Sequence, residues 1–438
     1  MSIEIFYLVI FALFLIFLLL GMHIHTVLLS IGVLGIIILE GPSYITTFMQ
    51  VEPYRVIASY TLTTIPLFVL MAQFIVQSRI VSDLYLIVYK LSKGKSGLLG
   101  VLSVIIGAFL GGVSGSTTGS SAALGQVAVP ELRKHGFRDD IAGSTIAAAG
   151  SLSGIIPPSI VLILYGVVTE TPIGTLFIGA IIPGLIMTIV IILVMLFLYN
   201  RDIKKRSVDI LNEPAKTTED LSLSRSLIVI GIFLAIMAVI FGGIYSGTFT
   251  PTEAGAIGAI LGLLTAFFLG KVNKQFFINS FSGTIKISSM VLLIMVTAQI
   301  FGRFITISQL PRELIGFLGP LIEYPVLMLV FICFIYFVLF MFIEGGAVII
   351  MATPILLPII QEMNVDLLWF GILVSVICTI GLLTPPVGLS VFAVSGVTGI
   401  SIERLFIQTS IFAVVLAIVV CGLMIAFPPI VTWLPSLM

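Results

Sequence analysis

Long apolar segments follow one another along the whole chain, and most have the length of a helix that crosses a membrane, about 20 residues. Ten of them predict complete crossings. These cover residues 5–22, 26–40, 56–77, 141–168, 176–198, 227–245, 254–270, 286–304, 368–397 and 405–427. Two more segments, 97–130 and 326–361, have small or turn-forming residues at their centres instead of a polar loop. They predict helical hairpins that dip halfway into the membrane and return to the same side.

Proline pairs interrupt two of the crossing segments at matching places. The pair at 157–158 divides the segment 141–168, and the pair at 385–386 divides the segment 368–397. Each pair ends a helix, because proline lacks the backbone N–H and clashes with the preceding turn. The carbonyl groups freed in this way need partners that lipid does not offer. A matched pair of interrupted helices in two halves of a chain is typical of the binding site of a secondary transporter.

Composition supports the membrane assignment and excludes several other classes. Hydrophobic residues make up 59% of the chain and charged residues 9%, whereas soluble domains have about 25% charged residues. The 20 basic and 20 acidic residues balance, so the chain has no polybasic surface for nucleic acid. The 3 cysteines lie apart in apolar segments and predict neither a disulfide framework nor a transition-metal site. The first apolar segment lacks the basic start of a secretory signal, which predicts a retained span.

The distribution of Lys and Arg predicts the orientation of the spans. With the N-terminus outside, 17 of the 20 basic residues fall in loops on the cytoplasmic side. Only Arg55, Arg303 and Arg312 remain outside. This is the asymmetry expected of a membrane protein with cytoplasmic basic loops. Basic loops flank the first hairpin and acidic residues flank the second, so the first is expected to enter from the cytoplasm and the second from outside.

The order of the segments predicts two repeats. Residues 1–198 and 227–438 each contain three spans, a hairpin, a broken span and a final span, and the polar stretch 199–226 is the predicted cytoplasmic linker. The first repeat starts outside and the second inside. The predicted fold class is therefore an all-α polytopic membrane protein with an inverted-topology repeat, two re-entrant helical hairpins and two broken helices.

The centre of the first hairpin is rich in hydroxyl groups and glycines. Sodium, a hard cation, prefers neutral oxygen ligands of this kind, and the first broken span offers backbone carbonyls to face them. The predicted sodium ligands of this half are Ser114, Ser116, Thr117, Gly150, Ser153, Ile156 and Pro157. The alternative is that these small residues only allow helices to pack closely. For the outlying Ser120 and Ser121, packing is at least as good an explanation.

The second half offers an equivalent set of residues. Its predicted sodium ligands are Gly345, Gly346, Thr379, Leu382, Thr384 and Pro385. The half-helices that begin after the breaks, at Ser159 and Gly388, present unpaired N–H groups and positive dipole ends, which suit a carboxylate. Cation and anion sites at the same breaks predict sodium-coupled transport of an organic acid.

Two charged residues are further candidates for substrate binding. Glu344 lies inside an apolar segment, where an acid costs on the order of 2.5–3.5 kcal/mol. It can bind a cation, pair with a base such as Arg303, or contact water at the hairpin centre. Arg303 can attract an anionic substrate or extend to the membrane interface as many arginines do.

Five stretches of the sequence carry a family resemblance. They are residues 111–123 (GGVSGSTTGSSAA), 129–136 (VPELRKHG), 148–166 (AAGSLSGIIPPSIVLILYG), 242–254 (GGIYSGTFTPTEA) and 382–396 (LLTPPVGLSVFAVSG). Together, and in this order, they resemble the large membrane subunit of tripartite ATP-independent periplasmic (TRAP) transporters. The stretch 242–254 is expected at an outer helix turn, in contact with the scaffold or a partner, and no chemistry is assigned to it.

The resemblance implies a function and a set of partners. Such subunits work in the bacterial inner membrane with a small four-helix membrane subunit and a periplasmic substrate-binding protein. They use a sodium gradient to import organic acids such as C4-dicarboxylates or sialic acid, need no cofactor beyond the coupling ion, and are not enzymes. No small-subunit segment precedes the chain, so an unfused large subunit is expected.

The resemblance and the segment order also predict which parts move. Spans 26–40, 56–77, 254–270 and 286–304 are expected to form a static scaffold with the small subunit. The hairpins and broken spans then carry the site across the membrane in an elevator-type motion.

Three other functions remain to be weighed against this one. A stand-alone sodium–dicarboxylate symporter or antiporter of related architecture would need no binding protein. A channel would conduct without a gradient-coupled cycle. An intramembrane enzyme would need a Ser–His or paired-Asp arrangement, and no predicted span contains His or Asp.

Overall fold

The computed structural model describes residues 3–78, 80–92, 95–203, 223–322 and 324–437. Helices connected by short turns make up this part of the chain, and it contains no strand. The first half comprises α1 (Ile3–Leu19), α2 (Ile24–Glu40), α3 (Pro42–Ile57), η1 (Tyr60–Thr63), α4 (Thr64–Gln77), α5 (Ile80–Ser92), α6 (Ser96–Ser114), α7 (Thr117–Lys134), α8 (Asp139–Ser151), η2 (Leu152–Gly154), α9 (Ile160–Thr169) and α10 (Ile173–Ile203). The second half comprises α11 (Leu223–Tyr245), α12 (Pro251–Phe268), α13 (Lys274–Ile307), α14 (Leu310–Ile322), α15 (Pro325–Phe342), α16 (Gly345–Glu362), α17 (Leu367–Gly381), α18 (Leu389–Thr398), α19 (Ile402–Leu416), η3 (Ala417–Cys421), α20 (Gly422–Ala426), α21 (Pro429–Thr432) and η4 (Pro435–Leu437).

Both hairpins and both broken helices are present. Helices α6 and α7 form the first hairpin, and α15 and α16 form the second. The first broken span consists of α8, η2 and α9, and the second of α17 and α18. Both proline pairs, Pro157-Pro158 and Pro385-Pro386, contain cis peptide bonds.

Seven helices in the described part of the chain are long and apolar enough to cross a membrane. They span Tyr60–Gln77, Ile173–Ile203, Pro251–Phe268, Lys274–Ile307, Pro325–Phe342, Gly345–Glu362 and Ile402–Ala426. The all-α polytopic fold class is therefore confirmed.

Three helices of more than ten residues were not predicted. Helix α3 occupies the first outer loop, and α5 and α14 lie immediately before the two hairpins. In α5 the apolar side chains of Ile80 and Ile87 are buried, and the helix packs on α6. Because α5 and α14 alternate polar and apolar residues at the helical period, a hydropathy average over 20 residues does not detect them.

Two helices extend beyond their predicted spans. Helix α13 begins at Lys274, so most of the predicted loop before residue 286 is helical. Helix α10 continues to Ile203, past the predicted start of the linker at 199. The rest of the linker up to residue 222 lies outside the described residues. The division into repeats 1–198 and 227–438 stays a prediction.

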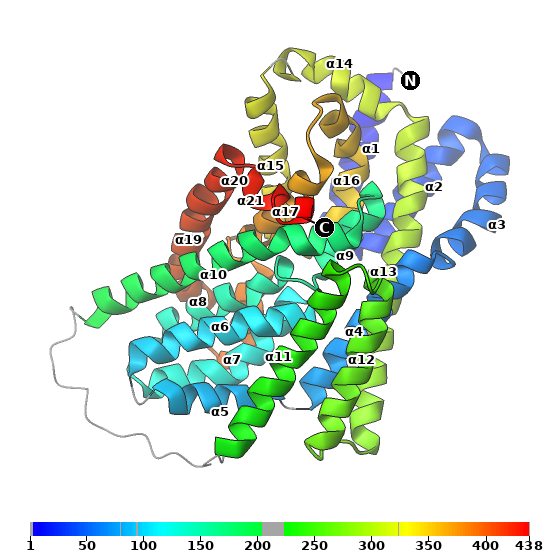
Figure 1. The fold of residues 1–438 in the computed structure, drawn as a ribbon. Helices are drawn as coiled ribbons and strands as arrows, with labels where there is room; N and C mark the ends of the chain where they lie inside the picture. The colour runs from blue at the N-terminus through cyan, green and yellow to red at the C-terminus, as the bar shows by residue number, and fades with distance from the viewer. Residues whose placement is uncertain (1–2, 79, 93–94, 204–222, 323, 438) are drawn as a thin grey trace.

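Helices of the first half pack on helices of the second half. Helix α2 packs on α13, and α4 packs on α12 and α13 (Figure 1). Glycines allow the close approach. A side chain at Gly32 would lie 3.0 Å from the backbone of Phe301, and one at Gly262 would lie 3.3 Å from the carbonyl oxygen of Met71. Small residues of this kind let membrane helices approach backbone to backbone.

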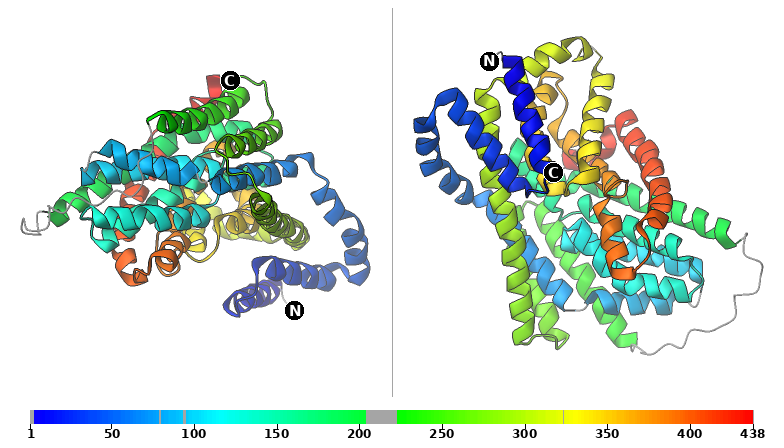
Figure 2. Two further views of the ribbon diagram at one scale, coloured as in Figure 1. Left: turned by 90° about the horizontal axis from the view of Figure 1, so that it is seen from below. Right: turned by 180° about the vertical axis from the view of Figure 1, so that it is seen from behind.

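The hairpins and broken spans form a second group of helices that also interlocks the two halves. The half-helix α9 of the first half packs on α16 of the second hairpin, and the half-helix α18 of the second half packs on α7 of the first hairpin. Helix α10 crosses the molecule and packs on α6, α8 and α17 (Figure 1). Helices α1 to α3 extend from one side of the molecule (Figure 2).

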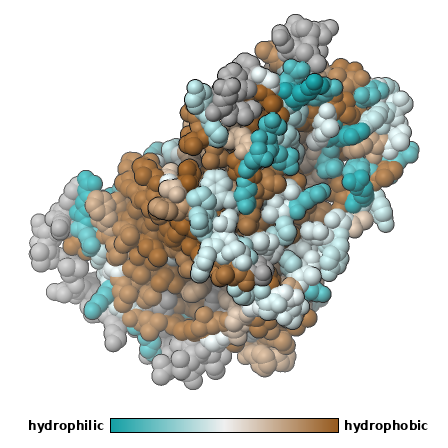
Figure 3. Space-filling view, turned by 45° about the horizontal axis from the view of Figure 1, so that its top comes forward, coloured by the Kyte–Doolittle hydropathy of each residue, from teal (hydrophilic) through white to brown (hydrophobic). Residues whose placement is uncertain are grey.

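The outer surface of the helices is largely apolar. Hydrophobic side chains cover a broad area of the face in Figure 3, and polar side chains gather toward one end. On α10, the residues Leu185, Ile189, Leu193 and Phe197 are each between 56% and 59% exposed and recur every fourth position. Such a stripe faces lipid or another membrane protein.

A polar cluster joins three helix ends on the predicted cytoplasmic side. The guanidinium of Arg138 forms hydrogen bonds with Asp140 and, at 3.1 Å, with Asp202 at the end of α10. The amide of Gln408 on α19 donates to Asp140 at 3.1 Å. Burial alone would raise the pKa of Asp140, but the hydrogen bonds and charge of Arg138, with Gln408, hold the pKa below its ordinary value.

We expect Asp140→Asn to lower the free energy of unfolding by about 1 kcal/mol at pH 7, because hydrogen bonds to charged groups are worth about 1.5–3 kcal/mol and partial exposure weakens them. Because folding lowers the pKa of Asp140, its contribution is complete above about pH 4, the ordinary value for an aspartate, and disappears as the pH falls through the lower folded-state value. Thermal unfolding in detergent across this pH range measures the difference. If the difference in stability between Asp140→Asn and the wild type increased in acid, this prediction would be wrong.

Candidate functional site

Four irregular segments of the chain meet inside the second group of helices. The first tip (residues 114–117) joins α6 to α7, and the second tip (residues 343–346) joins α15 to α16. The first break (residues 152–159) separates α8 from α9, and the second break (residues 382–388) separates α17 from α18. Most of the predicted ion and substrate ligands lie in these four segments.

Hydroxyl groups hold the shape of the first tip. Gly115 has φ of 59°, a left-handed conformation that favours glycine. The hydroxyl of Ser116 accepts a hydrogen bond from the backbone N–H of Gly119 at 3.3 Å and so caps α7. The hydroxyl of Ser114 forms a hydrogen bond with the hydroxyl of Ser120. Two of the predicted sodium ligands therefore also stabilise the turn that presents them.

The helix leading into the first tip contacts the first break through backbone atoms. A side chain at Gly111 would lie 2.8 Å from the backbone nitrogen of Ser153. One at Gly112 would lie 2.8 Å from the carbonyl oxygen of Pro157 and 3.2 Å from Ile156. Only glycine allows this approach. The structure thus brings the first tip and the first break together, as expected from the sequence.

Serine hydroxyls in the first break satisfy the carbonyl groups that the break frees. Ser153 donates to the carbonyl of Gly150 at 2.8 Å, and Ser159 donates to the carbonyl of Gly154 at 2.8 Å. A hydroxyl that donates its hydrogen in this way keeps its lone pairs for a cation. Ser159 also caps α9, so the N–H groups at the start of this half-helix point toward the break.

Residues from both halves meet beside the first break. A side chain at Gly154 would lie 3.1 Å from the hydroxyl oxygen of Thr379 and 3.3 Å from the methyl group of Thr117. The hydroxyl of Thr379 donates to the carbonyl of Ser375 at 3.1 Å. Gly154 was not among the predicted residues, although it is the small residue that lets the first tip and α17 approach each other.

The second tip is capped by an acid. The carboxylate of Glu344 accepts a hydrogen bond from the backbone N–H of Gly346 at 3.1 Å and caps α16. A side chain at Gly345 would lie 2.5 Å from the sulfur of Cys378 and 3.1 Å from Val161. Within the described residues, Glu344 forms no ion pair. Its position matches that of Ser116 in the first tip, but it brings a negative charge.

The second break is tied to the second hairpin. The N–H of Gly388 donates to the carbonyl of Met341 at the end of α15, at 3.1 Å. The carbonyl of Leu382 accepts from the N–H of Ser390 at 3.3 Å. The hydroxyl of Thr384 donates to the carbonyl four residues before it at 2.8 Å. The second break therefore repeats the arrangement of the first, with hydroxyl and carbonyl oxygens next to a hairpin tip.

The side chain of Arg303 contacts a tyrosine on a neighbouring helix. Its side chain donates to the hydroxyl of Tyr44 at 2.6 Å and lies over the tyrosine ring, 5.6 Å from the ring centroid. This contact joins α13 to α3. Among the contacts of the described residues, none links Arg303 to a tip or to Glu344. The structure thus favours the interfacial role for Arg303.

Two buried hydroxyl groups near the tips were not predicted as ligands. The oxygens of Ser121 and Ser390 are buried and have no hydrogen-bond partner. Ser121 faces Gly150, and Ser390 lies in α18, which packs on α7. A buried hydroxyl without a partner costs free energy unless water or an ion contacts it. For Ser121 the sequence leaves packing and ion contact open, and nothing local to Ser390 marks it.

The sequence matches the family profile described as "Tripartite ATP-independent periplasmic transporter, DctM component" over residues 11–430. The chain belongs to this family. It is a large permease subunit of the TRAP type, as the resemblance implied.

The names of the relatives of this TRAP large permease refer to several different substrates. The chain is 31% identical to the sialic acid TRAP transporter large permease protein SiaM of Vibrio cholerae over 388 residues, 87% of each chain. It is 30% identical to the C4-dicarboxylate TRAP transporter large permease protein DctM of Pseudomonas aeruginosa, over 84% of this chain and 85% of that protein. It is also 30% identical to the 2,3-diketo-L-gulonate TRAP transporter large permease protein YiaN of Escherichia coli, over 79% and 80%.

The fold is similar to that of a solved transporter. The crystal structure of the Alcanivorax borkumensis YdaH transporter matches with a TM-score of 0.65 over 89% of each chain, at 16% sequence identity. At this identity the likeness concerns the fold alone.

The signature stretch 242–254 of this TRAP large permease has a structural explanation. Gly243 makes room for the ring of Phe249, which lies against it. Thr250 and Glu253 form a capping box at the start of α12. The hydroxyl of Thr252 shares a buried hydrogen bond of 2.6 Å with Thr64 on α4. The stretch therefore builds a rigid turn that fixes α11 and α12 to α4.

Proposed function

We propose that this large permease imports an organic acid anion across the bacterial inner membrane, coupled to sodium, after delivery by a periplasmic binding protein. The observation that best supports this proposal is that a hairpin tip lies next to a helix break in each half of the chain. Each meeting offers hydroxyl and carbonyl oxygens for a cation. The adjoining half-helices begin at Ser159 and Gly388, where unpaired N–H groups suit a carboxylate.

The names of the relatives narrow the substrate class. Sialic acid, C4-dicarboxylates and 2,3-diketo-L-gulonate are all organic acids. Import of an anion against its gradient needs cations to move with it. One net positive charge moving down 100 mV releases about 2.3 kcal/mol. Two sodium ions with a monoanion carry one such charge, whereas with a dianion only the sodium concentration gradient drives uptake.

We further propose an elevator-type cycle. Helices α2, α4, α12 and α13 serve as the scaffold, and the small membrane subunit packs on them. The hairpins and broken spans serve as the moving unit. The interlocking of α9 with α16 and of α18 with α7 supports this division, because it ties both sites into one body.

Uptake by proteoliposomes tests the proposal. The large permease is reconstituted with its small membrane subunit, and labelled organic acids are offered with and without the binding protein and a sodium gradient. Uptake that requires both supports the proposal. Uptake without the binding protein indicates a stand-alone symporter or antiporter instead, and conductance without any gradient requirement indicates a channel.

Removal of two hydroxyls at the first tip tests the sodium assignment. We expect Ser116→Ala with Thr117→Ala to raise the sodium concentration for half-maximal uptake about 5- to 30-fold, because a lost buried polar interaction costs about 1–2 kcal/mol. Thr117→Val alone separates this effect from the loss of the Ser116 cap, since Thr117 does not cap α7. Thr118→Val is the matched control. An unchanged sodium dependence in the double variant would show that these residues only pack.

A further inference from the structure

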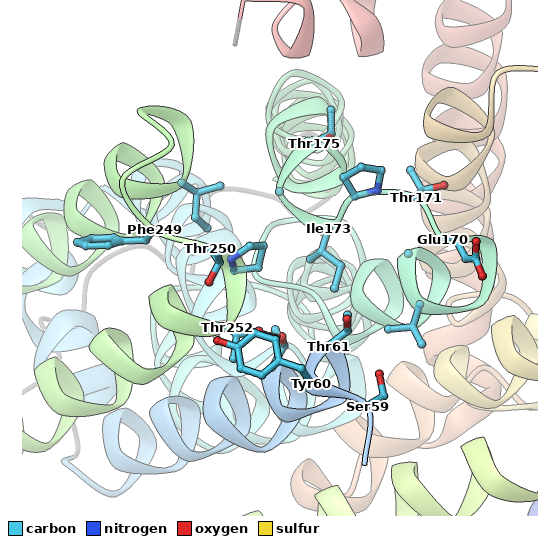
Figure 4. A pocket seen from close by; sticks show the side chains of 17 residues that line it. Ser59, Tyr60, Thr61, Glu170, Thr171, Ile173, Thr175, Phe249, Thr250 and Thr252 are labelled. Carbon is cyan, nitrogen blue, oxygen red and sulfur yellow. Dashed lines mark hydrogen bonds between the residues drawn. The ribbon is translucent and has the colours of Figure 1, made fainter. Parts of the chain in front are cut away.

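A cavity of about 690 Å³ lies at the junction of three chain segments outside the tips and breaks (Figure 4). The segments are residues 59–64 at the start of α4, residues 166–175 around the corner between α9 and α10, and residues 244–252 at the turn between α11 and α12. The distribution of basic residues places all three on the outer face of the membrane. The cavity is therefore open to molecules that arrive from outside.

Two of the three walls are rigidly joined. The buried hydrogen bond between Thr64 and Thr252 links the start of α4 to the start of α12. The third wall lies close to this pair, because a side chain added at Gly174 would lie 3.3 Å from Ile244 and 3.8 Å from Pro251. The two joined walls belong to the proposed scaffold, so this side of the cavity is formed without a ligand.

The lining carries many hydroxyl groups and lacks any positive charge. Eight of its 17 residues carry a hydroxyl group, and none is Lys, Arg or His. Its single charged residue is Glu170, which lies at the opposite end of the lining from Phe249 (Figure 4). A carboxylate substrate would find no cation here, so this cavity does not serve the anion that we propose as the cargo.

Glu170 breaks two local rules of helix termination. It has φ of 58°, a left-handed conformation that glycine or asparagine adopts with less strain. It also places a negative charge at the C-terminal end of α9, where the helix dipole favours a positive one. The side chain is exposed, and it forms no ion pair with any of the described residues. Residues that violate local preference in this way are expected where function requires them.

We propose that this cavity receives a lysine or arginine side chain of the soluble binding protein, with Glu170 as its ion-pair partner. The hydroxyl groups of the lining accept further hydrogen bonds from an ammonium or guanidinium group. Docking at this cavity holds the soluble protein against the rigid turn between α11 and α12. The inference rests on the proposed function, because it assumes delivery by a soluble protein.

Binding of the soluble protein to the reconstituted membrane complex tests this inference. We expect Glu170→Gln to raise the dissociation constant about 3- to 10-fold and Glu170→Lys to raise it more than about 10-fold, because a charge at an interface rim acts mainly on association. Raising the salt concentration should weaken wild-type binding more than binding of Glu170→Gln. Glu170→Gly relieves the backbone strain, so it should bind as weakly as Glu170→Gln while unfolding at a higher temperature.

Glu362→Gln is the matched control, because Glu362 is also an exposed acid on the predicted outer face but does not line the cavity. Equal binding by the wild type, Glu170→Gln and Glu170→Lys would overturn the inference. An equal loss of binding in Glu362→Gln would also overturn the inference, because it would show a general effect of negative charge on this face. Uptake that requires the soluble protein but does not depend on Glu170 refutes only this inference, whereas uptake that never requires the soluble protein refutes the proposed function.

Discussion

Gly111→Ala should lower sodium-coupled uptake at least about tenfold. The new methyl group would lie 2.8 Å from the backbone nitrogen and 2.9 Å from the Cα atom of Ser153. Backbone atoms cannot rotate away as a side chain can, so α6 must move off the first break. Overpacking of this kind costs about 1–3 kcal/mol. The movement would separate the hydroxyl groups of the first tip from the carbonyl groups of the first break.

Gly97→Ala in the same helix is the matched control. Its methyl group would meet its nearest neighbour, the ring of Tyr199, at 3.6 Å, which is ordinary contact. Uptake and thermal unfolding are measured for both variants. We expect Gly97→Ala to resemble the wild type in both. If Gly111→Ala transports at the wild-type rate with the wild-type sodium dependence, contact between the first tip and the first break is not needed for transport.

A covalent link between the moving unit and the scaffold should abolish uptake. A Cβ atom added at Gly174, at the start of α10, would lie 3.3 Å from the side chain of Ile244 at the end of α11, which is close enough for a crosslink between cysteines at these positions. Helix α10 packs on the hairpins and broken spans, whereas α11 packs on α12 of the scaffold. In an elevator-type cycle the two must slide past each other. We expect Gly174→Cys with Ile244→Cys to lose uptake on oxidation and to recover it on reduction.

Phe74→Cys with Gly262→Cys is the control for the crosslink. A Cβ atom at Gly262 would lie 3.3 Å from the Cβ atom of Phe74, and both residues belong to the scaffold and lie outside the cavity. A crosslink there joins parts that do not move relative to each other, so uptake should continue. All crosslinking variants also carry Cys333→Ser and Cys421→Ser, so that these native thiols cannot react. Cys378 is retained because it is fully buried. Full uptake by completely crosslinked Gly174→Cys with Ile244→Cys would exclude the elevator-type motion and indicate local gating.

The hairpins and the broken helices could be predicted because their causes are local. Proline pairs end helices wherever they occur, and a run of glycine and serine ends a helix within a few residues. Repetition of both signals in the two halves predicted where the tips and the breaks come together. The amphipathic helices α5 and α14 were missed because their apolar faces are too narrow to raise a hydropathy average over 20 residues.

Which residues lie together at the candidate site depended on contacts between positions that are distant in the sequence. The closeness of Thr379 to Gly154 and the hydrogen bond from Arg303 to Tyr44 on α3 cannot be read from positions so far apart in the sequence. Glu344 was recognised as an acid in an apolar segment, but its capping of α16 depends on how the second tip turns.

The sequence by itself determined the class of the protein, the places where its helices break and the oxygen-rich chemistry of its tips, since these follow from composition and from the backbone preferences of proline and glycine. Only the tertiary structure decided which oxygens meet, which hydroxyls are already used to cap helices, and that Glu170 lines a cavity without positive charge. Those properties arise from how separate segments of the chain pack on one another, as Thr64 and Thr252 and the walls of the cavity do, and no local pattern encodes such packing.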